Sequence, residues 1–193
     1  KIHHDIDKYN SINFIGLGSI DDFTVEAPDD FDAQQQAQLE QVPIIQQNTT
    51  TTGISWKRKY KNQRGQLIAA LSTNKLKNIF SRYSDNLNES GLIFRNDSHE
   101  WETKLRIKSI NYYKDWKLKW GGNIQLSNYF NATQNLSTGL NYNTEIEFYK
   151  YGLFANGSRS FFNNRLDFSI GFRVDEDTFS TGSNLLDNFS PRA

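Results

Sequence analysis

Hydrophobic and polar residues alternate along three long stretches of the chain, 101–111, 116–127 and 165–175. Side chains two residues apart lie on the same face of a β-strand, so this period predicts strands with one apolar and one polar face. The hydrophobic residues on the predicted apolar faces are Trp101, Leu105, Ile107, Trp116, Leu118, Trp120, Ile124, Leu126, Leu166, Phe168, Ile170 and Phe172. Weaker alternation occurs at 11–20, 53–60, 65–80 and 144–162. The pattern predicts about eight strands, and a ninth that begins at Phe189.

Polar segments separate these strands, and short segments alternate with long ones. The short segments contain Asn, Asp or Gly, which suits tight hairpins, and are 7–10, 62–65, 114–115 and 163–164. The long segments are 21–48, 84–98, 131–143 and 180–189. This order predicts an all-β fold, an antiparallel up-and-down meander of long strands. Tight turns at one end and long loops at the other are typical of a transmembrane β-barrel with short periplasmic turns and long extracellular loops.

Strand length and the positions of aromatic residues favour the same architecture. Segments 99–113, 116–130, 144–162 and 165–179 meet or exceed the ~9–11 residues that a tilted membrane strand needs. Aromatic residues lie near the ends of these segments, where barrels place them at the membrane interfaces. They are Tyr112, Tyr113, Trp116, Tyr129, Phe130, Phe161 and Phe162.

The first long segment, 21–48, has a distinct composition. Its charged residues are all acidic, and "DDFDAQQQAQLEQVP" combines an acidic start with helix-tolerant Gln and Ala and ends at Pro43. Acidic residues stabilise a helix N-terminus and proline does not continue a helix, so a short helix is predicted near 30–41. We expect this acidic segment to be an extracellular loop.

Composition narrows the class of protein. Hydrophobic residues make up 36% of the chain and the mean hydropathy is −0.71, with no run of the ~20 apolar residues that a spanning helix needs. Aromatic residues reach 14%, which is compatible with a barrel whose alternate residues contact lipid. The 22 basic residues equal the 22 acidic ones, which gives no indication of a nucleic-acid partner. Cysteine is absent, which excludes disulfides and thiolate sites.

Candidate chemistry is sparse. His3 and His4 are adjacent and so point to opposite faces of a strand, and His99 is distant in sequence, so no metal site is expected. The pairs Glu100/Glu102 and Glu145/Glu147 each share a strand face, and we expect them to be lumen-facing charges paired with Lys or Arg on the next strand. No catalytic arrangement and no cofactor motif is present, which predicts that the protein is not an enzyme.

Four segments of the sequence resemble the barrel of the TonB-dependent receptors of the bacterial outer membrane. They are FIGLGSIDDFTV (14–25), ISWKRKYKNQRGQL (54–67), YGLFANGSRSFFNNRLDFSIGFRVD (151–175) and LLDNFSPRA (185–193). The last two are the most specific: a YG-containing strand, a two-residue turn, an alternating strand from Arg165 to Asp175, a loop and an SPR sequence. The resemblance covers essentially the whole chain, but only the barrel region of the family.

The resemblance implies that residues 1–193 are a partial barrel domain of an energy-coupled nutrient receptor in the outer membrane of a Gram-negative bacterium. The signal peptide, the plug domain and the remaining strands of the family lie outside the sequence. The implied partners are outer-membrane lipid, the plug domain, the TonB complex and a siderophore, vitamin or glycan ligand. The twelve alternating hydrophobic residues are then expected to face lipid, and the four long loops to form the ligand vestibule without assigned contact residues.

Two alternatives remain open from the sequence. A complete small eight-stranded barrel with a structural or adhesive role requires its first and last strands to pair. A soluble β-sandwich that binds carbohydrate through exposed aromatic residues requires the face of Trp120 and Leu126 to be packed in a core.

Overall fold

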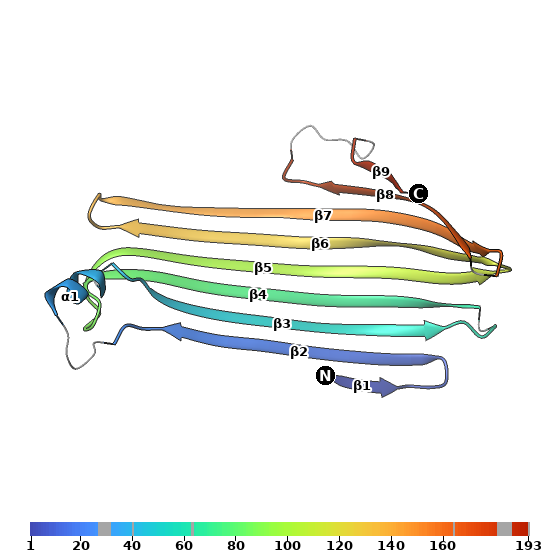
Figure 1. The fold of residues 1–193 in the computed structure, drawn as a ribbon, viewed down its shortest axis with the longest axis horizontal. Helices are drawn as coiled ribbons and strands as arrows, with labels where there is room; N and C mark the ends of the chain where they lie inside the picture. The colour runs from blue at the N-terminus through green and yellow to red at the C-terminus, as the bar shows by residue number, and fades with distance from the viewer. Residues whose placement is uncertain (27–31, 40, 63, 164, 181–186, 193) are drawn as a thin grey trace.

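Nine antiparallel strands follow one another across a single sheet in a computed structural model of the protein (Figure 1). The structure describes residues 1–26, 32–39, 41–62, 64–163, 165–180 and 187–192. The elements are β1 (Ile2–Asp5), β2 (Asn10–Phe23), α1 (Ala33–Leu39), β3 (Ile44–Lys59), β4 (Gly65–Asp85), β5 (Ser90–Tyr113), β6 (Trp116–Asn135), β7 (Leu140–Phe161), β8 (Leu166–Asp177) and β9 (Phe189–Arg192). The all-β, antiparallel up-and-down meander expected from the sequence is confirmed.

The register of the strands divides the sheet into two faces. Residues directly opposite each other in an antiparallel pair share a face. Trp120 lies opposite Ser109 of β5 and Ala155 of β7, and Ala155 lies opposite Phe172 of β8. We call the side that carries Trp120 the apolar face and the side that carries Lys119 the polar face. Followed from strand to strand, the register places all twelve hydrophobic residues of the sequence pattern on the apolar face.

Strand pairing continues much further than the sequence pattern indicated. The segments 84–98 and 131–143, expected to be long loops, consist mostly of strand: β4 pairs with β5 as far as Asp85 and Ser90, and β6 pairs with β7 as far as Asn135 and Leu140. The loop prediction is wrong for both segments. Polar residues occupy both faces there and remove the alternation, while polar side chains contact each other across the strands. The Asn96 side-chain amide, for example, donates to the Thr133 hydroxyl at 2.8 Å.

The connections lie at two ends of the sheet (Figure 1). The turn end carries the β1–β2, β3–β4, β5–β6 and β7–β8 connections, and the loop end carries the β2–β3, β4–β5 and β6–β7 connections. The strand β8 is shorter and ends at Asp177, opposite Lys150 of β7, so the β8–β9 connection begins before the loop end is reached. The first connection at the loop end contains α1, within the predicted range of 30–41. Most of the β8–β9 connection, 181–186, lies outside the described residues.

Asn86 attaches the end of α1 to the β4–β5 turn. Its side chain is 3% exposed, and its amide donates to the carbonyl oxygens of Leu39 at 2.6 Å and Val42 at 2.8 Å. Its side-chain oxygen accepts a hydrogen bond from the backbone N–H of Tyr83 at 2.9 Å. A buried amide with these partners holds the C-terminal end of α1 and Val42 against the β4–β5 turn, and the Leu39 carbonyl also accepts the backbone N–H of Val42 at 3.2 Å.

The sheet has no second layer in the part of the chain that the structure describes. Ile44 is the one buried hydrophobic residue among the described positions, whereas Trp120 is 51% exposed. A β-sandwich would bury that face, so its packed core is absent from the described residues. The strands β1 and β9 form the two edges and do not pair with each other. The closure that a small eight-stranded barrel requires is therefore also absent from the described part.

Candidate functional site

A continuous apolar band crosses the apolar face from β2 to β8. It combines residues of neighbouring strands that the register brings to the same level. We call this band the apolar belt, and its members are Ile12, Phe14, Ile54, Trp56, Leu71, Leu105, Ile107, Trp116, Leu118, Trp120, Ile124, Leu126, Leu153, Ala155, Leu166, Phe168, Ile170 and Phe172. Most of the large members are exposed in the sheet, among them Ile124 and Leu153. A soluble protein rarely exposes an apolar patch of this extent.

Toward the loop end, the belt stops where charged residues appear on the apolar face. On β4 the apolar face changes from Leu71 to Lys75, whose ammonium group lies 4.8 Å from the ring centre of Trp101. On β7 it changes from Tyr149 to Glu147 and Glu145. The expectation that these two glutamates face a lumen is wrong, because the register places them on the same face as Leu126. There the Glu145 carboxylate accepts a hydrogen bond from the side-chain amide of Asn128 at 3.1 Å.

The height of the belt matches the hydrocarbon layer of a membrane. Between Trp116 and Leu126, β6 rises about 34 Å along its own axis at ~3.4 Å per residue. A strand tilt of ~40° reduces this to about 26 Å, close to the ~25 Å band of outer-membrane barrels. The strands β4 to β7 continue well past the belt toward the loop end, as strand pairs with polar residues on both faces.

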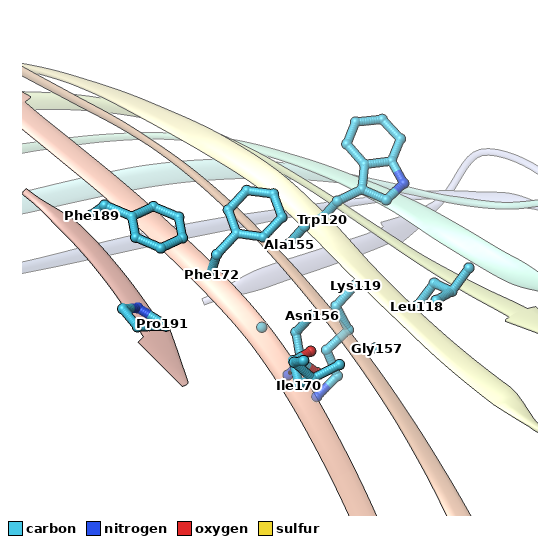
Figure 2. A pocket seen from close by; sticks show the side chains of 11 residues that line it. Leu118, Lys119, Trp120, Ala155, Asn156, Gly157, Ile170, Phe172, Phe189 and Pro191 are labelled. Carbon is cyan, nitrogen blue, oxygen red and sulfur yellow. Dashed lines mark hydrogen bonds between the residues drawn. The ribbon is translucent and has the colours of Figure 1, made fainter. Parts of the chain in front are cut away.

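The belt has an open hollow near β7 (Figure 2). Ala155 and Gly157 are small, and they lie between the larger side chains of β6 and β8. The hollow measures about 910 Å³, and the large side chains around it include Leu118, Trp120, Ile170, Phe172 and Phe189. A second apolar hollow of about 500 Å³ lies along the neighbouring strands, beside Ile124 and Leu153. The belt is therefore grooved rather than smooth.

The polar face opposite the belt carries a cluster of cations. Lys104, Arg106 and Lys108 alternate along β5, and Lys119 and Arg173 lie on the same face of β6 and β8. A hollow of about 400 Å³ is lined by Arg106, Lys108, Lys119 and Arg173. Among the described residues, only Arg173 of this cluster has an ion pair, with Asp175. Four cations without a carboxylate partner in the described part make this face attractive to an anionic group.

A glycine lies beside these cations on β6. Gly121 is on the polar face, opposite Lys108 of β5 and Phe154 of β7. A Cβ atom at this position would lie 2.3 Å from the carbonyl oxygen of Ile107, so the strand cannot accept a side chain there without moving.

A buried polar cluster lies on the polar face, level with the limit of the belt nearest the loop end. The Glu102 carboxylate accepts hydrogen bonds from Tyr129 at 2.7 Å and Gln125 at 3.0 Å. Gln125 also donates to the hydroxyl of Ser127 at 3.0 Å, and Ser127 is fully buried. The expectation that Glu102 is paired with Lys or Arg is wrong, because neutral donors of β6 satisfy its carboxylate. These bonds hold the glutamate as a fixed negative charge beside the cations of β5.

Tyr129 extends this cluster into an aromatic stack. Its ring lies 5.8 Å from that of Phe148 at an interplanar angle of 16°, and Phe148 lies 5.5 Å from Phe179. Tyr129 was expected in an interfacial girdle, but the register places it on the polar face, which corrects that assignment. Stacked rings beside hydrogen-bonding groups suit a planar or sugar-like ligand. One feature of the sequence could have indicated this cluster, namely the i, i+2 spacing of Gln125, Ser127 and Tyr129.

The histidines do not come together. His3 contacts Asn13 at 2.7 Å and Asp5 at 3.2 Å, and His99 contacts Asp97 at 2.9 Å on a distant strand. Among the described residues no group of three His, Cys, Asp or Glu side chains is placed to bind a metal ion. In the same residues, no helix has both the length and the apolar character required to cross a membrane.

Comparison with known proteins identifies a similar solved structure. No family model matches the chain, and no curated protein matches its sequence. The crystal structure of BauA, the ferric preacinetobactin receptor from Acinetobacter baumannii, is similar with a TM-score of 0.51 and 9% sequence identity. The match covers 96% of this chain and 34% of that chain, so this chain spans about a third of the receptor's length. At this identity the similarity shows that the two share a fold.

Proposed function

We propose that this chain forms part of the wall of a TonB-dependent receptor that takes up a nutrient across the outer membrane. In this proposal the apolar belt contacts lipid, and the polar face lines a lumen occupied by the plug domain of the full-length protein. The loop end then lies outside the cell and the turn end in the periplasm. The transported molecule is a siderophore, a vitamin or a glycan, and the TonB complex supplies the energy.

The belt is the observation that carries the proposal. It crosses the β2–β8 sheet at one level on one face, it has the height of a bilayer core, and on β5, β6 and β8 the opposite face is polar at the same level. The similarity to BauA supports a receptor-like barrel fold. The motifs of residues 151–193 point in the same direction, since they resemble the family barrel.

The polar face suggests where a ligand or plug contacts this part of the wall. We place that contact at the cations of β5 and β6 and at the stack of Tyr129 and Phe148. Lys104, Arg106 and Lys108 supply positive charge, and the fixed carboxylate of Glu102 adds a hydrogen-bond acceptor at the edge. Side chains on paired strands are held more rigidly than those on loops, which suits a specific contact.

Labelling from outside the cell tests the orientation. The full-length protein is expressed with a single cysteine in place of Ser137, in the β6–β7 turn, or in place of Asp115, in the β5–β6 turn. A maleimide that does not cross membranes is added to intact cells. The proposal predicts that the cysteine at 137 reacts and that the cysteine at 115 reacts only after the outer membrane is opened. Equal labelling of both positions in intact cells would contradict it.

Uptake measurements test the transport function. Cells with and without the full-length protein are supplied with labelled ferric siderophores, a labelled vitamin and labelled glycans. The proposal predicts accumulation of one class, which stops when the proton-motive force is collapsed. An outer-membrane protein that is correctly oriented but gives no energy-dependent uptake would instead favour a structural or adhesive role.

A further inference from the structure

The hollow over Ala155 and Gly157 has a polar group at one end. Arg159 lies two residues further along β7 on the same face, nearer the turn end. The rings of Trp116 and Phe168 contact each other edge to face, with centroids 6.4 Å apart, and these two residues are the strand partners of Arg159. From Arg159 toward the loop end, the surface therefore changes from a cation to an aromatic pair and then to the apolar hollow of Figure 2.

The guanidinium group of Arg159 is held in place and still has donors available. It donates one hydrogen bond to Asp115 at 2.7 Å and lies 4.8 Å from the ring centre of Phe161. Its Nε is a buried donor for which the described residues supply no acceptor. A guanidinium group has five N–H donors arranged to bind phosphate oxygens in pairs. Lys114, next to Asp115 in the β5–β6 turn, adds a second positive charge at this end.

We propose that this surface is a binding site for one anionic glycerophospholipid of the membrane leaflet at the turn end. The phosphate binds Arg159, and one acyl chain crosses the Trp116–Phe168 pair and fills the hollow over Gly157 and Ala155. Charge complementarity selects the phosphate. The spacing along β7 also suits a glycerophospholipid. Arg159 and Gly157 are two residues apart, so about 7 Å separates the cation from the start of the hollow. The proposal rests on the proposed function in one respect, namely that the apolar belt faces lipid.

The hollow depends on the absence of a side chain at position 157. A Cβ atom there would lie 3.5 Å from Leu118 and 3.6 Å from the ring of Trp116, which is ordinary van der Waals contact. Gly157→Ala is therefore accommodated by the strand, while Gly157→Leu places a branched side chain in the space of the acyl chain. Gly157→Leu therefore changes the shape of the lipid site, and Gly157→Ala, whose Cβ atom is accommodated, shows whether the strand tolerates a side chain at this position.

The experiment measures phospholipid retention by the full-length protein. The purified protein is equilibrated with phosphatidylglycerol in mild detergent, and the retained lipid is counted by native mass spectrometry. Arg159→Gln removes the charge and Gly157→Leu fills the hollow. Arg159→Gln is expected to lower retention about tenfold, the change that corresponds to the loss of one charge-assisted contact. Gly157→Leu is also expected to lower retention, because its side chain occupies the space of the acyl chain. Two substitutions elsewhere on the same face serve as matched controls: Arg58→Gln on β3 and Ala69→Leu on β4.

Five outcomes distinguish the possibilities. Loss of retention in the two site variants, with both controls unchanged, supports the site. Equal retention in all variants overturns it, and so does an equal loss in the controls, which would indicate lipid bound without specificity. The same proteins are also inserted into vesicles that contain brominated lipid, which quenches tryptophan fluorescence. Quenching with unchanged retention would overturn the phospholipid site alone, whereas no quenching in any variant would overturn both the site and the proposed membrane position.

Discussion

The hydroxyl group of Tyr129 donates a 2.7 Å hydrogen bond to the carboxylate of Glu102 on the neighbouring strand. The two residues are 27 positions apart in the chain, and the β5–β6 register brings them together on the polar face. Because Gln125 and Ser127 approach the same carboxylate oxygen, one acidic side chain links three positions of β6. This cluster lies where the apolar belt ends on the opposite face.

We predict that Tyr129→Phe destabilises the full-length protein by about 1.5–3 kcal/mol, the range for a hydrogen bond to a charged group. The ring stays in place on Phe148, so the change removes the hydroxyl alone. The free energy of unfolding in vesicles is the quantity to measure. Tyr142→Phe is the matched control, since Tyr142 is exposed on the same face and its hydroxyl has no hydrogen bond to a described residue. Equal effects in the two variants would show that the cluster contributes nothing.

A second prediction concerns the two faces of β6. Ile124 is in the belt, and Asn123, the preceding residue, is on the polar face. We expect Ile124→Lys to destabilise the protein by about 2–4 kcal/mol, because a lysine at mid-membrane depth is placed in lipid. The same substitution at Asn123 is expected to cost less than about 1 kcal/mol. Unfolding in vesicles compares the two, and a larger cost at Asn123 would mean that the faces are assigned the wrong way round.

A third prediction concerns the attachment of α1. Asn86→Ala removes the side-chain donor to the carbonyl oxygens of Leu39 and Val42. We expect this substitution to detach α1 from the β4–β5 turn and to make the α1 region sensitive to added protease in intact cells, while the sheet itself remains folded. Asn141→Ala, at an exposed position of β7, is the control. Unchanged cleavage in the Asn86 variant would rule out the proposed role of this side chain.

A fourth prediction concerns acid. The side-chain amide of Asn88 and then its backbone N–H hold the pKa of Asp85 below its usual value of 3.8. A carboxylate with a lowered pKa in the folded state contributes stability above its unfolded pKa, and this contribution disappears as the pH falls through the folded pKa. Asp85→Ala should therefore lower the unfolding midpoint at neutral pH and have little effect in strong acid. If Asp85→Ala lowered the unfolding midpoint equally at neutral pH and in strong acid, the stabilising role of the Asp85 carboxylate would be contradicted.

The strands that cross the belt were predictable because each has an apolar face and a polar face. Trp116, Trp120 and Ile124 alternate with polar residues, and a period of two is the signature of a sheet with unlike faces. Beyond Leu126 the same strand continues with Asn128 and Gln134 on the apolar side of the sheet and Asn131 and Thr133 on the polar side. A strand with similar surroundings on both faces has no such period, so these regions resembled loops in the sequence and were assigned incorrectly.

The polar cluster was less predictable for a different reason. The spacing of Gln125, Ser127 and Tyr129 places them on one face, but their shared acceptor depends on which residue of β5 lies opposite Ser127. A shift of the register by one residue would turn Glu102 to the other face. The register depends on the whole length of both strands and on the β5–β6 turn, so no local pattern reveals the partner. The position of α1 was predictable from its acidic start and Pro43, whereas its attachment to Asn86 was not.

The most direct test of the central claim is a spin-label scan along β6 of the full-length protein in lipid bilayers. The chain contains no cysteine, so each introduced cysteine is unique within it. We predict high accessibility to oxygen at even positions from 116 to 126 and low accessibility to oxygen at the odd positions between them, which face the plug-filled lumen. We also predict that oxygen accessibility falls at every position beyond Asn128. Equal accessibility to oxygen at even and odd positions between 116 and 126 would show that the belt does not face lipid.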